Sequence, residues 1–196
     1  MEKHILFLNK SIEIIESDDI NKDNLEYRWY GPWNAVLNYW FGSKFILIPQ
    51  YEILYELVDR DNNMVYKSIK PDFTIVEYIY EDDVFYKRIG MIVEIKRSSN
   101  DIEKDFKTAS KQLGCQVSAL FSNGEYKYVY GITAIGKYWR LYKYNFIRTN
   151  IHKKTWDNAG YNDATNNYRR VYESRTLDIS SKNYYNDFNE LTRLIN

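Results

Sequence analysis

The sequence has few of the residues that several common kinds of active site require. Its 196 residues include one cysteine, Cys115, and two histidines, His4 and His152. A single cysteine cannot form an internal disulfide, which suits a reducing compartment. Two histidines leave little for a His-rich zinc site or for a Ser-His-Asp triad. The formal net charge is zero, so the total charge points to no acidic partner.

Long hydrophobic runs are also missing. The N-terminal segment MEKHILFLNK has an apolar run of only four residues, too short for the core of a signal peptide. No window of the sequence approaches the ~20 apolar residues of a membrane span. We therefore expect a soluble intracellular protein of the cytoplasm or nucleus that does not associate with membranes.

Aromatic residues are abundant: 20 Tyr, 9 Phe and 5 Trp make up 17% of the chain. Such residues favour strands, so we expect a sheet-rich fold, and the length predicts one domain with at most an appendage. The charge is unevenly divided, because residues 137–196 hold 11 Lys and Arg against 6 Asp and Glu. The neutral total therefore hides a basic C-terminal third.

Residue patterns predict an α/β (α+β) domain with one mixed sheet flanked by helices. Gly31-Pro32 opens a helix, and Asn100-Asp-Ile-Glu103 resembles the capping box of a second helix that ends near 122. Strands are expected at 45–58 (one or two, broken at Pro49), 64–68, 72–80, 84–88, 90–97, 126–134 and 137–144.

The last part of the chain is expected to differ from residues 1–150. Residues 151–196 form a basic extension, rich in Asn and Tyr, that ends in an amphipathic helix. We expect this extension to pack on the same domain. The apolar stripe of its helix could also face a partner, which leaves a homodimer open.

The sharpest feature for chemistry is a pair of acidic positions on neighbouring strands. Pro71-Asp72 starts one expected strand, and Glu94-Ile95-Lys96 ends another. Side chains alternate along a strand, so Glu94 and Lys96 share a face. Two carboxylates and a backbone carbonyl, such as that of Ile95, suit a magnesium ion, which keeps several waters. A metal lowers the pKa of a bound water, and an adjacent lysine can orient or deprotonate that water.

The acidic-x-Lys pattern alone is not specific. Asp105-Phe-Lys107 and Glu125-Tyr-Lys127 match it too, but the first lies in an expected helix and the second at a turn. Taken singly, Asp72 reads as a turn residue, and Glu94 and Lys96 as a solvated strand face. Only the combination, in its order of strands and helix, favours a metal site.

At these residues the chain resembles the PD-(D/E)XK nuclease superfamily, the restriction-endonuclease-like fold, over roughly residues 26–145. The resemblance implies a core in the order α-β-β-β-α-β and a Mg²⁺- or Mn²⁺-dependent nuclease. We expect DNA as its substrate in preference to RNA, although the sequence does not decide between them. It assigns Asp72 and Glu94 as metal ligands and Lys96 as the catalytic lysine. Many members add a glutamine on the following helix, for which Gln112 is the first choice and Gln116 the second.

A narrower resemblance is carried by Tyr30-Gly-Pro-Trp-Asn34, Ile48-Pro-Gln-Tyr51 and Tyr130-Gly-Ile-Thr-Ala134. These segments are similar to restriction-endonuclease-like domains of fungal proteins, including the nuclease domains of Crinkler-type effectors from fungi and oomycetes. Such domains often carry a glutamate before the Tyr-Gly-Pro, which implies Glu26 as an additional metal or active-site carboxylate. The chain departs from the pattern at Ser110, where those domains have an acidic residue.

Nucleic-acid contacts are expected from the basic C-terminal third, since charge on the phosphate backbone supplies most non-specific affinity. Tyr126, Tyr128 and Tyr130 alternate onto one strand face and could stack bases, although tyrosines in strands more often only pack. The alternative to an enzyme is a nuclease-like effector or interaction module that binds nucleic acid or protein without turnover. The basic residues expected to contact phosphates are Arg140, Lys143, Arg148, Lys153 and Lys154.

Overall fold

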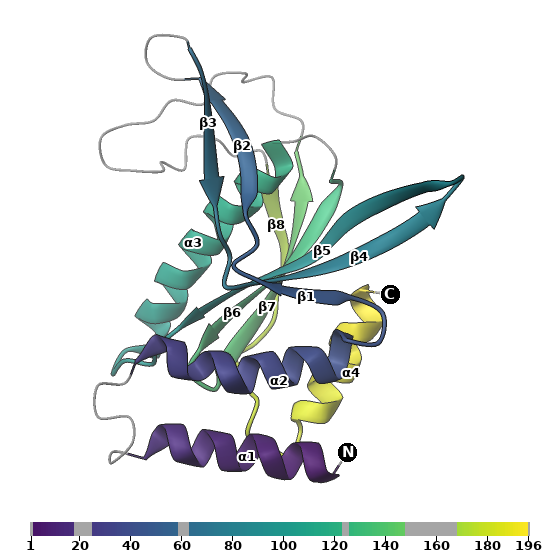
Figure 1. Cartoon of the computed structure of the whole chain (residues 1–196). Coiled ribbons are helices and arrows are strands. Elements are labelled where there is room, and N and C mark those ends of the chain that lie inside the picture. Colours follow the sequence, from purple (N-terminus) through teal and green to yellow (C-terminus); the bar gives the residue numbers. More distant parts are fainter. Residues whose placement is uncertain (1, 18–24, 59–62, 123–125, 148–167, 196) are drawn as a thin grey trace.

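A computed structural model describes residues 2–17, 25–58, 63–122, 126–147 and 168–195 (Figure 1). The helices are α1 (Glu2–Glu16), the short 3₁₀ helix η1 (Glu26–Trp29), α2 (Tyr30–Phe41), α3 (Ile102–Ser122) and α4 (Tyr184–Ile195). The strands are β1 (Ile46–Pro49), β2 (Ile53–Val58), β3 (Met64–Ile69), β4 (Phe73–Glu81), β5 (Val84–Lys96), β6 (Tyr128–Ile135), β7 (Tyr138–Phe146), β8 (Tyr168–Glu173) and β9 (Leu177–Asp178).

The strands form one mixed sheet and a separate hairpin. The sheet has the order β1-β4-β5-β6-β7-β8, with β9 also paired to β7. Strands β5 and β6 are parallel and are connected through α3, while the other pairs in this sheet are antiparallel. Strands β2 and β3 pair only with each other and lie between β1 and β4 in the chain. The structure is therefore a mixed α and β fold, as the residue patterns predict.

Helices cover both faces of the sheet (Figure 1). On one face, α1, α2 and α4 bury a core that includes Trp33 and Phe188 against Val93 and Ile95 of β5. On the other face, α3 and β2 pack against residues that include Ile92. Successive residues of β5 thus point into two different cores, because side chains alternate along a strand. None of the helices in the described ranges combines the length and apolar character needed to cross a membrane.

The chain outside the predicted core also joins this sheet. Strands β8 and β9 extend it beyond β7, and α4 buries Tyr184, Phe188 and Leu191 in the core with α2. The described part of the C-terminal extension therefore packs on the same domain as the rest of the chain.

The structure corrects two of the local predictions. Residues 84–96 form one strand rather than two, because β5 accommodates Gly90 as a bulge opposite the step from Ile75 to Val76. The cap of α3 is Asp101 rather than Asn100: the Asp101 carboxylate accepts a hydrogen bond from the Lys104 N–H at 3.0 Å. The predicted hairpin of 45–58 with 64–68 is confirmed for β2, which pairs with β3, whereas β1 pairs with β4 instead.

Candidate active site

The antiparallel register of β4 and β5 brings Asp72 close to Glu94. Phe73 pairs with Val93, so Asp72, one residue before β4, lies beside the end of β5 that carries Glu94. The contact is direct, because the Ile95 N–H donates a hydrogen bond to Asp72 Oδ2 at 2.7 Å. Asp72 is 6% exposed. Residues more than 20 positions apart in the sequence therefore meet at one end of the central strands.

Two further side chains hold Asp72 in place. The Tyr30 hydroxyl donates a hydrogen bond to Asp72 Oδ1 at 2.5 Å, and Gln50 Nε2 donates to the same oxygen at 3.2 Å. The Gln50 backbone N–H also donates to the Asp72 carbonyl at 3.1 Å. Gln50 has φ of 49°, a left-handed conformation that non-glycine residues adopt at a cost. The break between β1 and β2 thus places a strained glutamine against the carboxylate.

Glu94 is the most buried acidic side chain of the site, at 1% exposure. It lies on the face of β5 that also carries Ile92, beneath α3. Lys96 Nζ lies 2.6 Å from Glu94 Oε1, and Gln116 Nε2 of α3 donates a hydrogen bond to Glu94 Oε2 at 2.6 Å. Both oxygens of this carboxylate are therefore oriented by neighbouring side chains.

Burial and neighbouring charges shift the ionisation of the site. Burial, followed by the charge of Asp72, raises the pKa of Glu94 to about 7, although Lys96 and Gln116 act in the opposite direction. Burial lowers the pKa of Lys96, but its hydrogen bond to Glu94 and the nearby carboxylates outweigh that effect and raise the pKa. Lys96 is therefore an ammonium group at neutral pH. Burial and the hydrogen bond to Asp72 raise the pKa of Tyr30, which stays a donor.

Glu26 reaches the site through the lysine. Its Oε2 lies 3.5 Å from Lys96 Nζ, where η1 brings it to the edge of the site. Within the described ranges, no three or more His, Cys, Asp and Glu side chains are grouped so that they could hold a metal. The structure thus places Glu26 in contact with the lysine of the site, and its role as an additional metal or active-site carboxylate stays a prediction.

The donor set of the two carboxylates still suits a hard divalent cation. An ionised carboxylate offers about four lone-pair sites. Asp72 accepts three hydrogen bonds here and Glu94 is contacted by two donors, so lone pairs remain on both. Gln116 Oε1 is buried without a hydrogen-bond partner in the described structure, and a water bound to a cation would supply one. Magnesium is commonly held by one or two carboxylates with several waters.

The helix glutamine of the site is Gln116, which corrects the choice of Gln112. Gln112 is exposed, whereas Gln116 is fully buried against Glu94. The two residues are four apart, which in an α-helix is one full turn plus about 40°. That rotation carries Gln116 toward the buried stripe of Leu113 and Val117 and leaves Gln112 outside it.

Sequence reasoning assigned no role to Tyr30 or Gln50. Both residues lie in segments that carry the narrower resemblance, Tyr30-Gly-Pro-Trp-Asn34 and Ile48-Pro-Gln-Tyr51. Their contacts with Asp72 require β1 and the start of α2 to lie beside β4, which only the folded chain reveals. In the sequence, each appears only as a polar side chain among apolar neighbours, and this pattern does not indicate which residue it contacts.

The expected phosphate-binding residues are not gathered into one cluster in the described structure. Arg140 contacts Glu103, lies 3.5 Å from Glu173, and donates a hydrogen bond to Thr176 at 2.8 Å, so its charge is largely compensated. Lys143 lies instead over the rings of Tyr128 and Tyr130. The other three residues, Arg148, Lys153 and Lys154, lie outside the described residues.

Comparison of the chain with protein-family models, with curated proteins and with solved structures finds no match. The chemistry of the site therefore has to be read from its own contacts. Two buried carboxylates lie beside a charged lysine, and each is oriented by donors from other parts of the fold. Such a site can bind a cation through oxygen atoms and present a positive charge to an anionic substrate.

Proposed function

We propose that this chain is a divalent-metal-dependent nuclease of the PD-(D/E)XK, restriction-endonuclease-like type, and that DNA is its substrate. The observation that carries the proposal is the meeting of Asp72 with the Glu94-Ile95-Lys96 segment through the Ile95 N–H. The element order α2, β1, β4, β5, α3, β6 supports it, since the same order is implied by the resemblance, with β2 and β3 inserted after β1.

Asp72 and Glu94 would hold the Mg²⁺ or Mn²⁺ ion, which when bound supplies an acidic water and neutralises charge on a phosphodiester. Lys96 contributes a positive charge that orients the attacking water and stabilises charge developing on the phosphate. Because the pKa of Lys96 is raised, the ammonium form is the one present at neutral pH, and the lysine does not act as the base in that form.

The remaining side chains position these groups. Gln116 fixes one oxygen of Glu94, and Tyr30 and Gln50 fix one oxygen of Asp72. Partners of this kind keep carboxylates in the orientation that a cation requires. Gln116 is fully buried, which keeps it from exchanging its hydrogen bond for water.

A cleavage assay tests the proposal directly. The full chain is incubated with plasmid DNA, and separately with an RNA substrate, in Mg²⁺, Mn²⁺ or EDTA. We expect DNA cleavage that requires the metal and falls at least about 100-fold in Lys96→Ala, the size expected when one charge-stabilising group is removed. Lys107→Ala is the matched control, because Lys107 belongs to the same acidic-x-Lys pattern but is exposed on α3.

Metal binding is measured without turnover by titrating Mn²⁺ into the wild type and into Glu94→Gln. We expect the wild type to bind and the variant to lose most of its affinity. Equal cleavage by the wild type and Lys96→Ala would refute the nuclease proposal. Nucleic-acid binding that persists with neither cleavage nor Mn²⁺ affinity would instead identify a binding module without turnover.

A further inference from the structure

A second region of the molecule has features that the proposed nuclease site does not use. Strand β5 pairs with β6 only from Met91 onward, opposite Tyr130, while its first half continues with β4 as a projecting hairpin (Figure 1). The bulge at Gly90 bends β5 at this point. A cleft of about 670 Å³ lies between the first half of β5 and the start of β6, a size typical of ligand sites.

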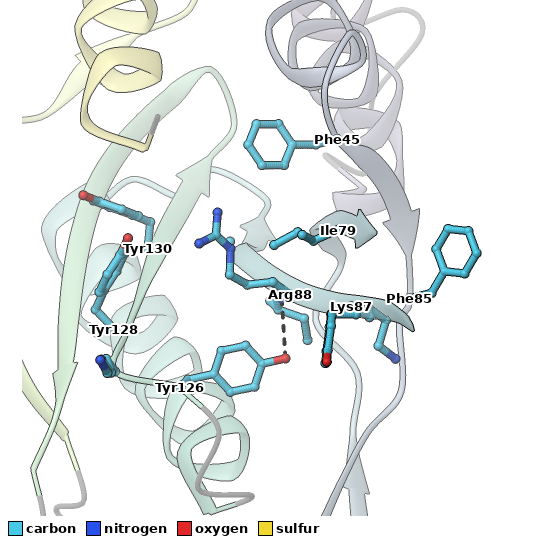
Figure 2. Close-up of a pocket in the computed structure, with 12 residues that line it drawn as sticks. Phe45, Ile79, Phe85, Lys87, Arg88, Tyr126, Tyr128 and Tyr130 are labelled. Atoms are coloured by element: carbon cyan, nitrogen blue, oxygen red, sulfur yellow. Dashed lines mark hydrogen bonds between the residues drawn. The ribbon is translucent and has the colours of Figure 1, made fainter. Parts of the chain in front are cut away.

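Aromatic side chains line this cleft. Tyr126 reaches across it, and its hydroxyl accepts a hydrogen bond from the Ile89 N–H at 3.4 Å (Figure 2). Tyr128 and Tyr130 form the wall on the β6 side, where Tyr128 is 44% exposed. Tyr86 lines the opposite strand and is 50% exposed. Large exposed rings on both sides of a cleft offer flat faces for another planar group.

The charged residues known to line the cleft are positive. Lys87, Arg88 and Lys127 line it, and no acidic residue does so in the described part of the chain. Arg88 forms an ion pair with Glu77 from the neighbouring strand. Lys143 adds a positive charge at the β6 wall, with its Nζ 4.8 Å from the centre of the Tyr128 ring. The cleft therefore complements an anion that also carries aromatic rings.

We infer that the cleft between β5 and β6 binds single-stranded nucleic acid. Bases stack on Tyr86 and Tyr128, and phosphates contact Lys87, Lys127 and Lys143. Alternating aromatic and cationic groups of this kind are the usual means of binding an unpaired strand. The contact of Lys143 with the Tyr128 ring does not prevent this, because a cation over an exposed ring is held more weakly than a stacked base.

The geometry favours an unpaired strand over a duplex. A single tyrosine side chain spans the cleft between β5 and β6, so the two walls are too close for base-paired DNA. An extended peptide could instead add to the unpaired edge of β5. The positive charges of Lys127 and Lys143 and the exposed rings favour a polyanion with bases, and the peptide becomes an outcome of the test.

This site is separate from the carboxylates and does not depend on the nuclease proposal. Six residues separate Arg88 from Glu94 along β5, which at about 3.3 Å per residue is about 20 Å. Binding can therefore be measured in EDTA, where no metal-dependent cleavage occurs. Fluorescence anisotropy with labelled 12-nucleotide DNA and RNA strands reports affinity, and the matching duplexes test for the unpaired state.

Substitutions in the cleft give the expected changes. Tyr128→Ala should weaken single-strand binding about 5- to 150-fold, the range for losing one base–aromatic stack. Lys127→Gln and Lys143→Gln should each reduce the slope of log affinity against log salt by about 0.7, the value for one phosphate contact on a single strand. Tyr66→Ala and Lys107→Gln are matched controls, because both side chains are exposed elsewhere, and they should bind as the wild type.

Three results would overturn the inference. The protein could bind the duplex as tightly as the single strands, or the affinity could be unchanged in Tyr128→Ala and in both lysine variants. Binding could also be lost in Lys96→Ala but kept in the cleft variants. The last result would place the strand at the carboxylate site instead. Displacement of the strand by an uncharged peptide, with no effect of salt, would identify a peptide groove. Strand binding that depends on the cleft in a protein that never cleaves would refute only the nuclease proposal.

Discussion

Replacing Glu94 with glutamine should change how the stability of the protein depends on pH. In the folded chain, burial and the charge of Asp72 raise the pKa of Glu94 from 4.5 to about 7. Between these values the folded state binds more protons than the unfolded state, so the free energy of unfolding falls as pH rises. At about 1.4 kcal/mol per pH unit, the shift from 4.5 to about 7 sets a limit of about 3.5 kcal/mol, of which about 3 kcal/mol is lost above pH 4.5.

The assay is urea denaturation in EDTA at several pH values from 4.5 to 8. The measured quantity is the unfolding free energy of the wild type minus that of Glu94→Gln. We expect this difference to fall by up to about 3 kcal/mol across the window and to level off above pH 7. Lys96 stays charged throughout, so the loss of its partner shifts the variant's curve by a constant and leaves its slope unchanged.

Glu56→Gln is the control, because Glu56 is exposed on β2, and its curve should run parallel to that of the wild type. Parallel curves for the wild type and Glu94→Gln would refute the reasoning, since they would mean that Glu94 titrates alike in the folded and unfolded chains. Addition of Mg²⁺ should flatten the wild-type curve, because a cation bound to the carboxylate favours its ionised form.

Three further perturbations follow from named contacts. Gln116→Leu should reduce metal-dependent cleavage about 10- to 100-fold, the size expected for a residue that orients a ligand, whereas Gln112→Leu should cleave as the wild type. Tyr30→Phe removes the hydroxyl that donates a hydrogen bond to the Asp72 carboxylate. It should lower the unfolding free energy by about 1.5–3 kcal/mol in urea denaturation. Gly136→Ala should destabilise the chain by at least about 1 kcal/mol in the same assay, because φ is +59° and the added carbon would meet neighbouring side chains at 3.2–3.3 Å. Gly31→Ala, in a helix with open space around it, should be neutral or stabilising, and equal effects of the two glycine changes would contradict this account.

The interior of the site carries costs that a purely structural core would avoid. Glu94 is a buried carboxylate with a raised pKa, and Gln50 adopts a left-handed backbone conformation beside Asp72. Both features reduce stability, and such costs concentrate where a protein positions groups for chemistry. Their coincidence around one carboxylate pair supports the proposed function, which is carried by the contact of Asp72 with the Ile95 N–H.

Much of the fold could be predicted because its determinants are local. Alternation and helical stripes located most of the strands and the two central helices, including the antiparallel pairing of β2 with β3. The errors have local causes as well: the Gly90 bulge allows a strand to continue where the sequence suggests a break, and Asp101 caps α3 one residue later than the pattern suggests.

Sequence by itself determined the chemical character of the site, since it named Asp72, Glu94 and Lys96 and left little for histidine or cysteine chemistry. Only the tertiary structure decided which groups support them, because Gln116 and Tyr30 come from helices that reach the sheet through packing. A residue's type and spacing are properties of the chain, whereas its partner depends on strand register and helix rotation. The cleft between β5 and β6 is also visible only in the tertiary structure, because it lies where two strands distant in sequence diverge.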